Sequence, residues 1–206
     1  MPWEMGLLGG IQRLNLHDNV LTGTIPGELF KLSALETLSL SFNRLVGQIP
    51  SEIAISSSLA VLRLSNNLIG GSIASELGRV TTLTTLDLGT NVISQTIPTE
   101  MYQLTNLKWL SLENNPLLTG RLPTEFGEFT NLEYFSISNT TIRARIPSQY
   151  AALTKLTDLR MSHTLVGGDI PDDVENLTEL LSVDLADSRF RQTIPSILGN
   201  FRDMSK

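Results

Sequence analysis

The stretch LTTLDLGTNVISQTIPTEM at residues 83–101 carries the pattern of the whole chain, and LETLSLSFNRLVGQIPSEI at residues 35–53 repeats it almost position by position. In both, leucines alternate with polar residues, an asparagine follows, and an Ile-Pro pair comes next. Seven units of this kind have 24 residues and the fifth has 25. The eight units begin at Ile11, Leu35, Leu59, Leu83, Leu107, Leu132, Leu156 and Leu180. An internal period of this length indicates a solenoid of stacked units.

Proline provides an independent check on the period. Eight of the nine prolines fall at one position of the unit when the chain is aligned as starting partway through a repeat. They are Pro2, Pro26, Pro50, Pro98, Pro123, Pro147, Pro171 and Pro195. Pro116 lies in the longer fifth unit, and Ala74 stands where the third unit would have its proline. Because proline fixes φ, we expect each unit to leave a second short strand there and turn along the outer side.

The leucines indicate where each unit forms its main strand. In a Leu-x-Leu segment such as Leu62 and Leu64, the two side chains lie on the same face of a strand, because side chains alternate with period two. Stacking the units would align these strands in a parallel sheet over one continuous core. We therefore expect the equivalent leucines to be buried, namely Leu62, Leu86, Leu110 and Leu159.

An asparagine follows the strand in the first five units. These residues are Asn19, Asn43, Asn67, Asn91 and Asn115. A carboxamide both donates and accepts, so a buried asparagine can bond to backbone groups of its own unit and of the neighbouring one. The last three units carry Thr140, Thr164 and Ser188 instead. Because a hydroxyl reaches less far, we expect a weaker ladder of hydrogen bonds in those units.

A glycine marks the bend that follows in five of the units. It is present as Gly23, Gly47, Gly71, Gly120 and Gly168. Gln95, Ala144 and Gln192 replace it in the other three. These replacements predict that the bend does not require a positive φ.

The consensus LxxLxLxxNxLxGxIPxxLxxLxx resembles the plant-specific class of leucine-rich repeat, and the resemblance extends over residues 1–203. It implies an α/β solenoid: a right-handed leucine-rich repeat horseshoe with a parallel concave sheet, short second strands, and 3-10 helices or loops on the outer side. Members of this class include receptor-like kinase ectodomains, polygalacturonase-inhibiting proteins and repeat proteins of photosynthetic microalgae. The resemblance implies recognition of a ligand in a cell-surface or secreted, receptor-like protein of signal transduction.

The repeats predict one domain over residues 1–206. Residues 1–10 align with the second half of a unit, residues 11–203 form the eight units, and residues 204–206 are a tail. Solenoids need polar caps, because each unit buries its core only against its neighbours. Neither end has such a cap, so we expect a fragment of a longer protein or a chain capped by flanking sequence or by another chain. A signal peptide, transmembrane helix or kinase domain could flank this segment.

Composition excludes several classes of function. The net charge is −6 and no basic stripe stands out, which argues against nucleic-acid binding. No apolar run is long enough to span a membrane. Cysteine is absent, so there are no disulfides and no thiolate zinc sites. His17 and His163 lie six strands apart, roughly 29 Å at about 4.8 Å per strand, and cannot share a metal. We expect no enzyme activity, no metal site and no cofactor.

The outward positions of the predicted sheet are the candidate binding surface. Trp109 and Tyr134 should be neighbours on adjacent strands and face solvent, and such side chains dominate binding hot spots. Charged residues surround them. The candidate ligand-binding residues are Arg63, Thr85, Asp87, Trp109, Glu113, Tyr134, Asp158 and Arg160. We expect a protein, peptide or glycan ligand on this concave face, although aromatic residues are also common in strands without binding anything.

Other functions remain compatible with the sequence. The missing cysteines favour an intracellular, cytoplasmic interaction scaffold, whereas the resemblance favours an extracellular or plasma-membrane-attached protein. An enzyme inhibitor is a further alternative. Ice binding would need a regular array of hydroxyl side chains, which Arg63, Asp87 and Arg160 interrupt. The sequons at Asn139 and Asn176 could accept glycans in a secreted protein.

Overall fold

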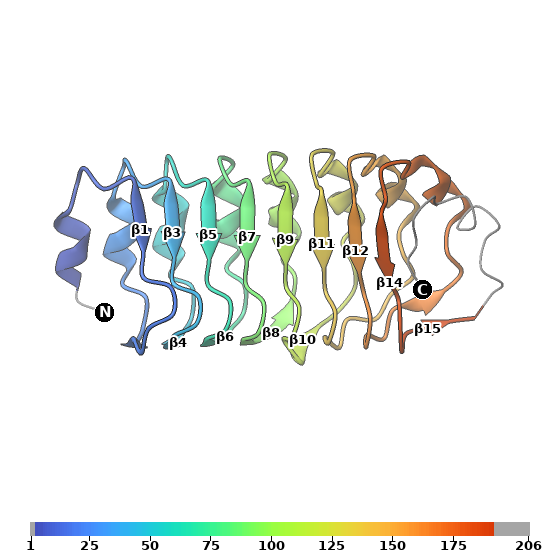
Figure 1. Ribbon diagram of the computed structural model, residues 1–206, viewed down its shortest axis with the longest axis horizontal. Helices are drawn as coiled ribbons and strands as arrows, with labels where there is room; N and C mark the ends of the chain where they lie inside the picture. The colour runs from blue at the N-terminus through green and yellow to red at the C-terminus, as the bar shows by residue number, and fades with distance from the viewer. Residues whose placement is uncertain (1–2, 192–206) are drawn as a thin grey trace.

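The computed structural model describes residues 3–191 of the chain. Within these residues, eight parallel strands form one sheet in the order β1-β3-β5-β7-β9-β11-β12-β14, one strand from each unit. Figure 1 shows them side by side along the long axis of the molecule. The strands are β1 (Arg13–Asn15), β3 (Thr37–Ser39), β5 (Val61–Arg63), β7 (Thr85–Asp87), β9 (Trp109–Ser111), β11 (Tyr134–Ser136), β12 (Asp158–Arg160) and β14 (Ser182–Asp184). The predicted parallel sheet is therefore confirmed.

Strand register places equivalent residues of successive units beside one another. Leu62 pairs with Leu86, and Leu86 pairs with Leu110. All three are fully buried, and Leu159 is only 6% exposed. The expected inward orientation of these leucines is confirmed. One hydrophobic core runs through all the described units, because each unit covers the leucines of the next.

A second row of short strands runs along the other side of the core. The members of its longer sheet are β2 (Thr22–Gly23), β4 (Arg44–Gly47), β6 (Leu68–Gly71), β8 (Val92–Thr96) and β10 (Leu117–Thr119). A separate pair follows, formed by β13 (Gly167–Gly168) and β15 (Arg189–Phe190). Residues 141–147 form no regular strand between the two, yet backbone hydrogen bonds bridge the gap. The second strands implied by the resemblance are therefore present, with this one interruption among the described units.

Short 3-10 helices cover the outer side of the core. They are η1 (Trp3–Leu7), η2 (Gly27–Lys31), η3 (Ser51–Ile55), η4 (Ser75–Arg79), η5 (Thr99–Gln103), η6 (Thr124–Glu128), η7 (Ser148–Ala152) and η8 (Asp172–Asn176). From η2 onward each helix begins directly after the proline position of its unit. Pro50 has φ −63°, and Ala74 adopts φ −65° without a pyrrolidine ring. The proline therefore favours a backbone angle that the repeat adopts in any case.

The asparagines connect neighbouring units, as a ladder requires. Asn67 Nδ2 donates to the carbonyl of Leu40 in the preceding unit and to those of Leu64 and Ser65 in its own. Its Oδ1 accepts a hydrogen bond from the backbone N–H of Leu45 at 3.0 Å. Asn43, Asn91 and Asn115 repeat this arrangement. Asn19, in the first full unit, bonds to carbonyls of its own unit.

The hydroxyl residues that replace asparagine make fewer of these bonds. Thr140 Oγ1 donates to the Ile137 carbonyl at 2.8 Å, within its own unit. Ser188 reaches back to the Met161 carbonyl of the preceding unit at 2.8 Å. A hydroxyl has one proton to donate, whereas a carboxamide has two, which explains the thinner ladder after residue 131.

Backbone angles at the bend contradict one expectation. Gln95 keeps the positive φ of the glycine column, at 70°, between Gly71 at 72° and Gly120 at 96°. The bend therefore imposes this conformation on a residue that disfavours it. Ala144 differs, because it is not among the described residues with positive φ. Gln192, residues 204–206, Pro2 and Pro195 lie outside the described residues, as does the end of the eighth unit.

Candidate functional site

Trp109 and Tyr134 lie directly opposite each other on β9 and β11. Their rings stack with centroids 3.7 Å apart and planes 3° from parallel. Trp109 is 42% exposed, whereas Tyr134 is only 7% exposed. The expectation that both rings face solvent is wrong for Tyr134, because the indole covers the phenol ring. The exposed aromatic surface of the pair is thus the indole of Trp109, stacked on the Tyr134 ring.

A hollow of about 240 Å³ opens beside this pair on the concave sheet. Trp109, Tyr134, Glu113, Asp87, Phe42 and Asn66 form much of its wall. Gly89 also lines it, at a unit position that is serine in four of the eight units, namely Ser41, Ser65, Ser138 and Ser162. A Cβ at position 89 would lie 3.0 Å from the Ser111 hydroxyl, so a side chain there would fill part of the space.

The acidic residue of the hollow is fixed by hydrogen bonds. Glu113 Oε2 accepts a bond from Ser136 Oγ at 2.6 Å and a longer one from the Tyr134 hydroxyl at 3.4 Å. Burial raises the pKa of Tyr134, and the neighbouring Glu113 carboxylate raises it further. The phenol therefore stays protonated and donates. Asp87 Oδ1 accepts the backbone N–H of Gly89 at 3.1 Å, which orients a second carboxylate at the hollow.

The opposite side of the aromatic pair carries an ion pair. Arg160 Cζ lies 5.3 Å from the centroid of the Tyr134 ring, within the range of a cation–π interaction. The same guanidinium pairs with Asp158 at 3.6 Å. The aromatic pair therefore has two carboxylates on one side and an arginine–aspartate pair on the other.

The structure brings together only part of the predicted binding set. Asp87, Trp109, Glu113 and Tyr134 line the hollow. Arg160 and Asp158 adjoin it through Tyr134. Arg63 and Thr85 lie on the neighbouring strands β5 and β7 but do not line it.

Six residues that line the hollow were absent from the predicted binding set, namely Phe42, Ser65, Asn66, Gly89, Thr90 and Ser111. Phe42, Asn66 and Thr90 line it and have positive φ values of 57°, 57° and 52°. Their unit position adopts this left-handed conformation wherever it is described, which turns the chain out of the concave sheet. Gly89, at a unit position that is serine in four of the eight units, was the one signal in the sequence that could have indicated the hollow.

The sequons lie on the surface. Asn139 is exposed, and its Nδ2 donates to Asn114 Oδ1 at 2.9 Å. Asn176 is exposed at the end of η8. Glycosylation at either residue stays a prediction.

The two histidines have separate partners. His17 contacts Phe42 edge-to-face at 5.1 Å, and His163 Nδ1 lies 3.3 Å from Asp187. Over residues 3–191, no group of three histidine, cysteine, aspartate or glutamate side chains is placed to hold a metal ion. No helix in this same range is both long and apolar enough to cross a bilayer.

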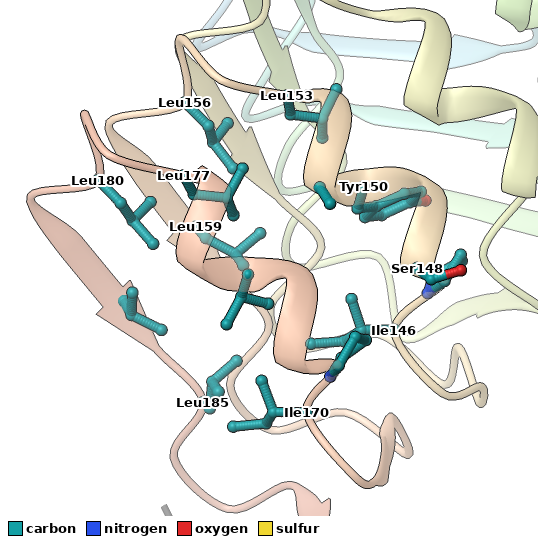
Figure 2. A pocket seen from close by; sticks show the side chains of 15 residues that line it. Ile146, Ser148, Tyr150, Leu153, Leu156, Leu159, Ile170, Leu177, Leu180 and Leu185 are labelled. Atoms are coloured by element: carbon teal, nitrogen blue, oxygen red, sulfur yellow. The ribbon is translucent and has the colours of Figure 1, made fainter. Parts of the chain in front are cut away.

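A second hollow lies inside the core rather than on the surface. Figure 2 shows it between η7 and η8, with Leu153, Leu177 and Leu180 among the surrounding side chains. It measures about 30 Å³, no more than the volume of one water molecule, and its lining is almost entirely apolar. Tyr150 turns its hydroxyl away to donate to the Pro123 carbonyl at 3.2 Å. We interpret this hollow as a packing gap.

Comparisons with known proteins agree with this architecture. Residues 57–117 match a family model described as leucine rich repeat, and residues 10–32, 34–54 and 106–129 match a second model of the same description. No curated protein matches the chain.

Solved structures match over nearly the whole chain. The ectodomain of the Arabidopsis thaliana membrane receptor kinase GASSHO1/SCHENGEN3, in complex with CASPARIAN STRIP INTEGRITY FACTOR 2, is 34% identical with a TM-score of 0.95. The match covers 98% of this chain and 24% of that one. The Arabidopsis receptor kinase HAESA, in complex with the peptide hormone IDA and the co-receptor SERK1, is 28% identical with a TM-score of 0.92, covering 98% and 34%. The chain thus spans about a quarter to a third of these relatives.

A plant ice-binding protein is also similar. It is 31% identical with a TM-score of 0.78, and the match covers 86% of this chain and 57% of that protein.

Proposed function

Because the chain belongs to the leucine-rich repeat family, we propose that it is a non-catalytic recognition module that binds a peptide on its concave sheet. One observation carries this proposal: the hollow beside the stacked Trp109 and Tyr134 rings, with Glu113 and Asp87 at its wall. The related receptor ectodomains were solved with a peptide hormone or factor bound, which supports a peptide as the ligand class.

The chemistry of the hollow favours a basic side chain of that peptide. The exposed face of Trp109 offers a site for a cation, and indole is the best aromatic partner for one. Glu113 and Asp87 would neutralise the charge. A lysine or arginine of the ligand would lie over the indole with its charged end between the carboxylates. Beyond Tyr134, Arg160 and Asp158 neutralise each other, so a basic group of the peptide would favour the side of Glu113 and Asp87.

The likeness to receptor ectodomains also supports a place for the module in the extracellular part of a receptor-like protein. The comparable region is a quarter to a third of each ectodomain, so the activity of a whole receptor belongs to the proposal. We do not extend it to ice binding, because charged Arg63, Asp87 and Arg160 interrupt the hydroxyl columns of the concave face.

A display library of random peptides selected against the chain tests this proposal. The selected peptides should be enriched in lysine and arginine. Trp109→Ala should then weaken their binding by about thirtyfold, the loss expected of a hot-spot residue worth about 2 kcal/mol. Glu113→Gln should weaken basic peptides more than neutral ones.

Tyr102→Ala is the matched control, since Tyr102 on η5 is 41% exposed and lies away from the concave sheet. It should bind the selected peptides as the wild type does. Circular dichroism would confirm that each variant is folded. Unchanged affinity in folded Trp109→Ala, or equal loss in Tyr102→Ala, would refute the concave site.

A further inference from the structure

Beside the second row of strands, on a different face from the concave sheet, the fifth and sixth units form a hollow of about 920 Å³. Arg121, Arg143 and Arg145 line this hollow, and all three side chains are exposed. The sequence prediction that the chain carries no basic stripe is wrong for this face, because an overall charge of −6 says nothing about local clustering.

The basic surface continues into the next units. The stem of Arg145 lies over Gly168, where its Cγ would be 3.0 Å from an added Cβ. Gly168 belongs to β13, which pairs with β15, and β15 begins at Arg189. Arg191 follows directly after it and is exposed. We call these residues the arginine strip: Arg121, Arg143, Arg145, Arg189 and Arg191.

No carboxylate neutralises the strip from within the described residues. None of its guanidinium groups makes an ion pair or a side-chain hydrogen bond with any residue from 3 to 191. Asp169 occupies the same unit position as Arg121 and Arg145 but does not pair with either. Unpaired charges of one sign repel each other, so an external anion bound here would lower the free energy of the folded chain.

Backbone bonding on this face restricts the kind of ligand. The N–H groups of Thr141, Arg143, Leu165 and Gly167 each donate to a carbonyl of the preceding unit, at 2.8 to 2.9 Å. Arg189 N–H does the same to Val166 at 2.8 Å. A peptide strand therefore finds no free backbone row to pair with. A ligand on this face can therefore contact side chains only. The arginine side chains extend over three unit spacings of about 4.8 Å each, roughly 14 Å in total.

We propose that the arginine strip binds an acidic polysaccharide, whose repeated carboxylate or sulfate groups the guanidinium forks would hold. Planar guanidinium groups match both anions with paired hydrogen bonds. A strip of this length suits a polymer better than one small anion. A separate hollow towards the N-terminus is lined by Gln48, Ser72 and Thr96 but also by Glu52 and Glu76, whose carboxylates would confine an acidic polymer to the arginine strip.

The composition of the strip argues against single-stranded nucleic acid as its ligand. Proteins that bind such strands stack their bases on aromatic side chains. Phe190 is the aromatic side chain of β15, and it packs against the core.

The proposal is tested by measuring the affinity of the whole chain for two polysaccharides, heparin with its sulfate groups and alginate with its carboxylate groups. Each affinity is measured at about 50 mM and at about 200 mM NaCl. Wild type should bind at least one of them and lose affinity at the higher salt. Replacing Arg121, Arg143 and Arg145 by glutamine should weaken that binding at least tenfold. If only heparin binds, the strip recognises sulfate; if only alginate binds, it recognises carboxylate.

The matched control replaces Arg13, Arg44 and Arg79 by glutamine, which removes the same charge from exposed positions in the first three units. It should keep its affinity within about twofold of wild type. If the strip variant unfolds because Arg145 covers Gly168, Arg121→Gln with Arg143→Gln replaces it.

Several outcomes would overturn the proposal. The first is that wild type binds neither polysaccharide. The second is that the strip and control variants lose polysaccharide affinity equally. The third is that wild type binds poly-glutamate or single-stranded DNA as tightly as the polysaccharide. Loss of polysaccharide binding in Trp109→Ala would also overturn it, because that residue lies on the concave sheet.

Discussion

Units one to five, residues 11–131, and the described part of units six to eight, residues 132–191, share one backbone but are joined differently. In the first region a carboxamide such as Asn67 bonds to carbonyls of two units and accepts an N–H from the preceding one. In the second, Thr140 bonds to its own unit alone. Backbone hydrogen bonds and the apolar core join the units in both regions, and the first region adds carboxamide bonds between its units.

The side chains beside the second row of strands change one unit earlier. In the second to fourth units, Gln48, Ser72 and Thr96 line this face together with Glu52 and Glu76. From the fifth unit onward, Arg121 and Arg143 make it basic. The comparison shows that the side chains fixing the coil and those facing solvent can change independently, because alternate residues of each strand face opposite sides.

The largest loss of stability should come from replacing an asparagine of the hydrogen-bond ladder. Asn91→Ala removes three donated bonds and one accepted bond at a buried position. The Leu64 and Leu88 carbonyls keep donors in Asn67 and Asn115, but the backbone N–H of Ile69 loses its acceptor. We expect a loss of about 3 kcal/mol in the free energy of unfolding, since one buried unpaired N–H costs about 1 to 3 kcal/mol and each lost hydrogen bond contributes about 0.5 to 1.5 kcal/mol more. Urea unfolding followed by circular dichroism measures it.

Thr140→Ala is the matched change in the second region. It removes one hydrogen bond, so we expect a loss of only about 1 kcal/mol. Equal losses in the two variants would show that the asparagines do not join the units more strongly than the hydroxyls do.

The next largest effect should be a loss of stability at alkaline pH, caused by Tyr150 in the second region. Tyr150 fills a core position that holds Leu29, Ile53 and Leu77 in earlier units, and burial raises its pKa well above the ordinary value of 10.0. The unfolded phenol loses its proton near pH 10 while the folded one keeps it. The unfolded state then binds fewer protons, so stability is complete below pH 10 and falls as the pH rises above it.

Tyr150→Phe provides the control for this pH dependence. It should be less stable at neutral pH, because the Pro123 carbonyl loses its donor. Between pH 10 and 11.5, roughly the range above the free phenol pKa, its stability should fall less steeply than that of wild type. Identical slopes would show that Tyr150 does not cause the alkaline loss. Tyr134 also has a raised pKa and would leave a residual slope in both proteins.

Sequence periodicity was sufficient to predict the coil, the buried leucines and the bonding role of the asparagines. Those features depend on one unit and its neighbour, so the repeat itself reveals them. The burial of Tyr134 under Trp109 depends on the rotamers of two particular rings, which no repeat position specifies. The arginine strip brings together Arg121, Arg145 and Arg189 from three units, and charge composition averages such a cluster away.

The positive φ of Gln95 could not be predicted from the sequence either. The replacement of glycine at this position suggested a bend without a positive φ, but the bend keeps the positive φ of the neighbouring units. A non-glycine residue in this conformation costs roughly 1 kcal/mol, so Gln95→Gly should stabilise the first region by up to about 1 kcal/mol. Ala144 lacks a positive φ, so Ala144→Gly only adds freedom to the unfolded chain and should destabilise the second region by about 0.5 to 1 kcal/mol. Urea midpoints measured for both variants should shift in opposite directions. Shifts in the same direction would mean that the two bends respond alike, and that the regions do not differ at this position.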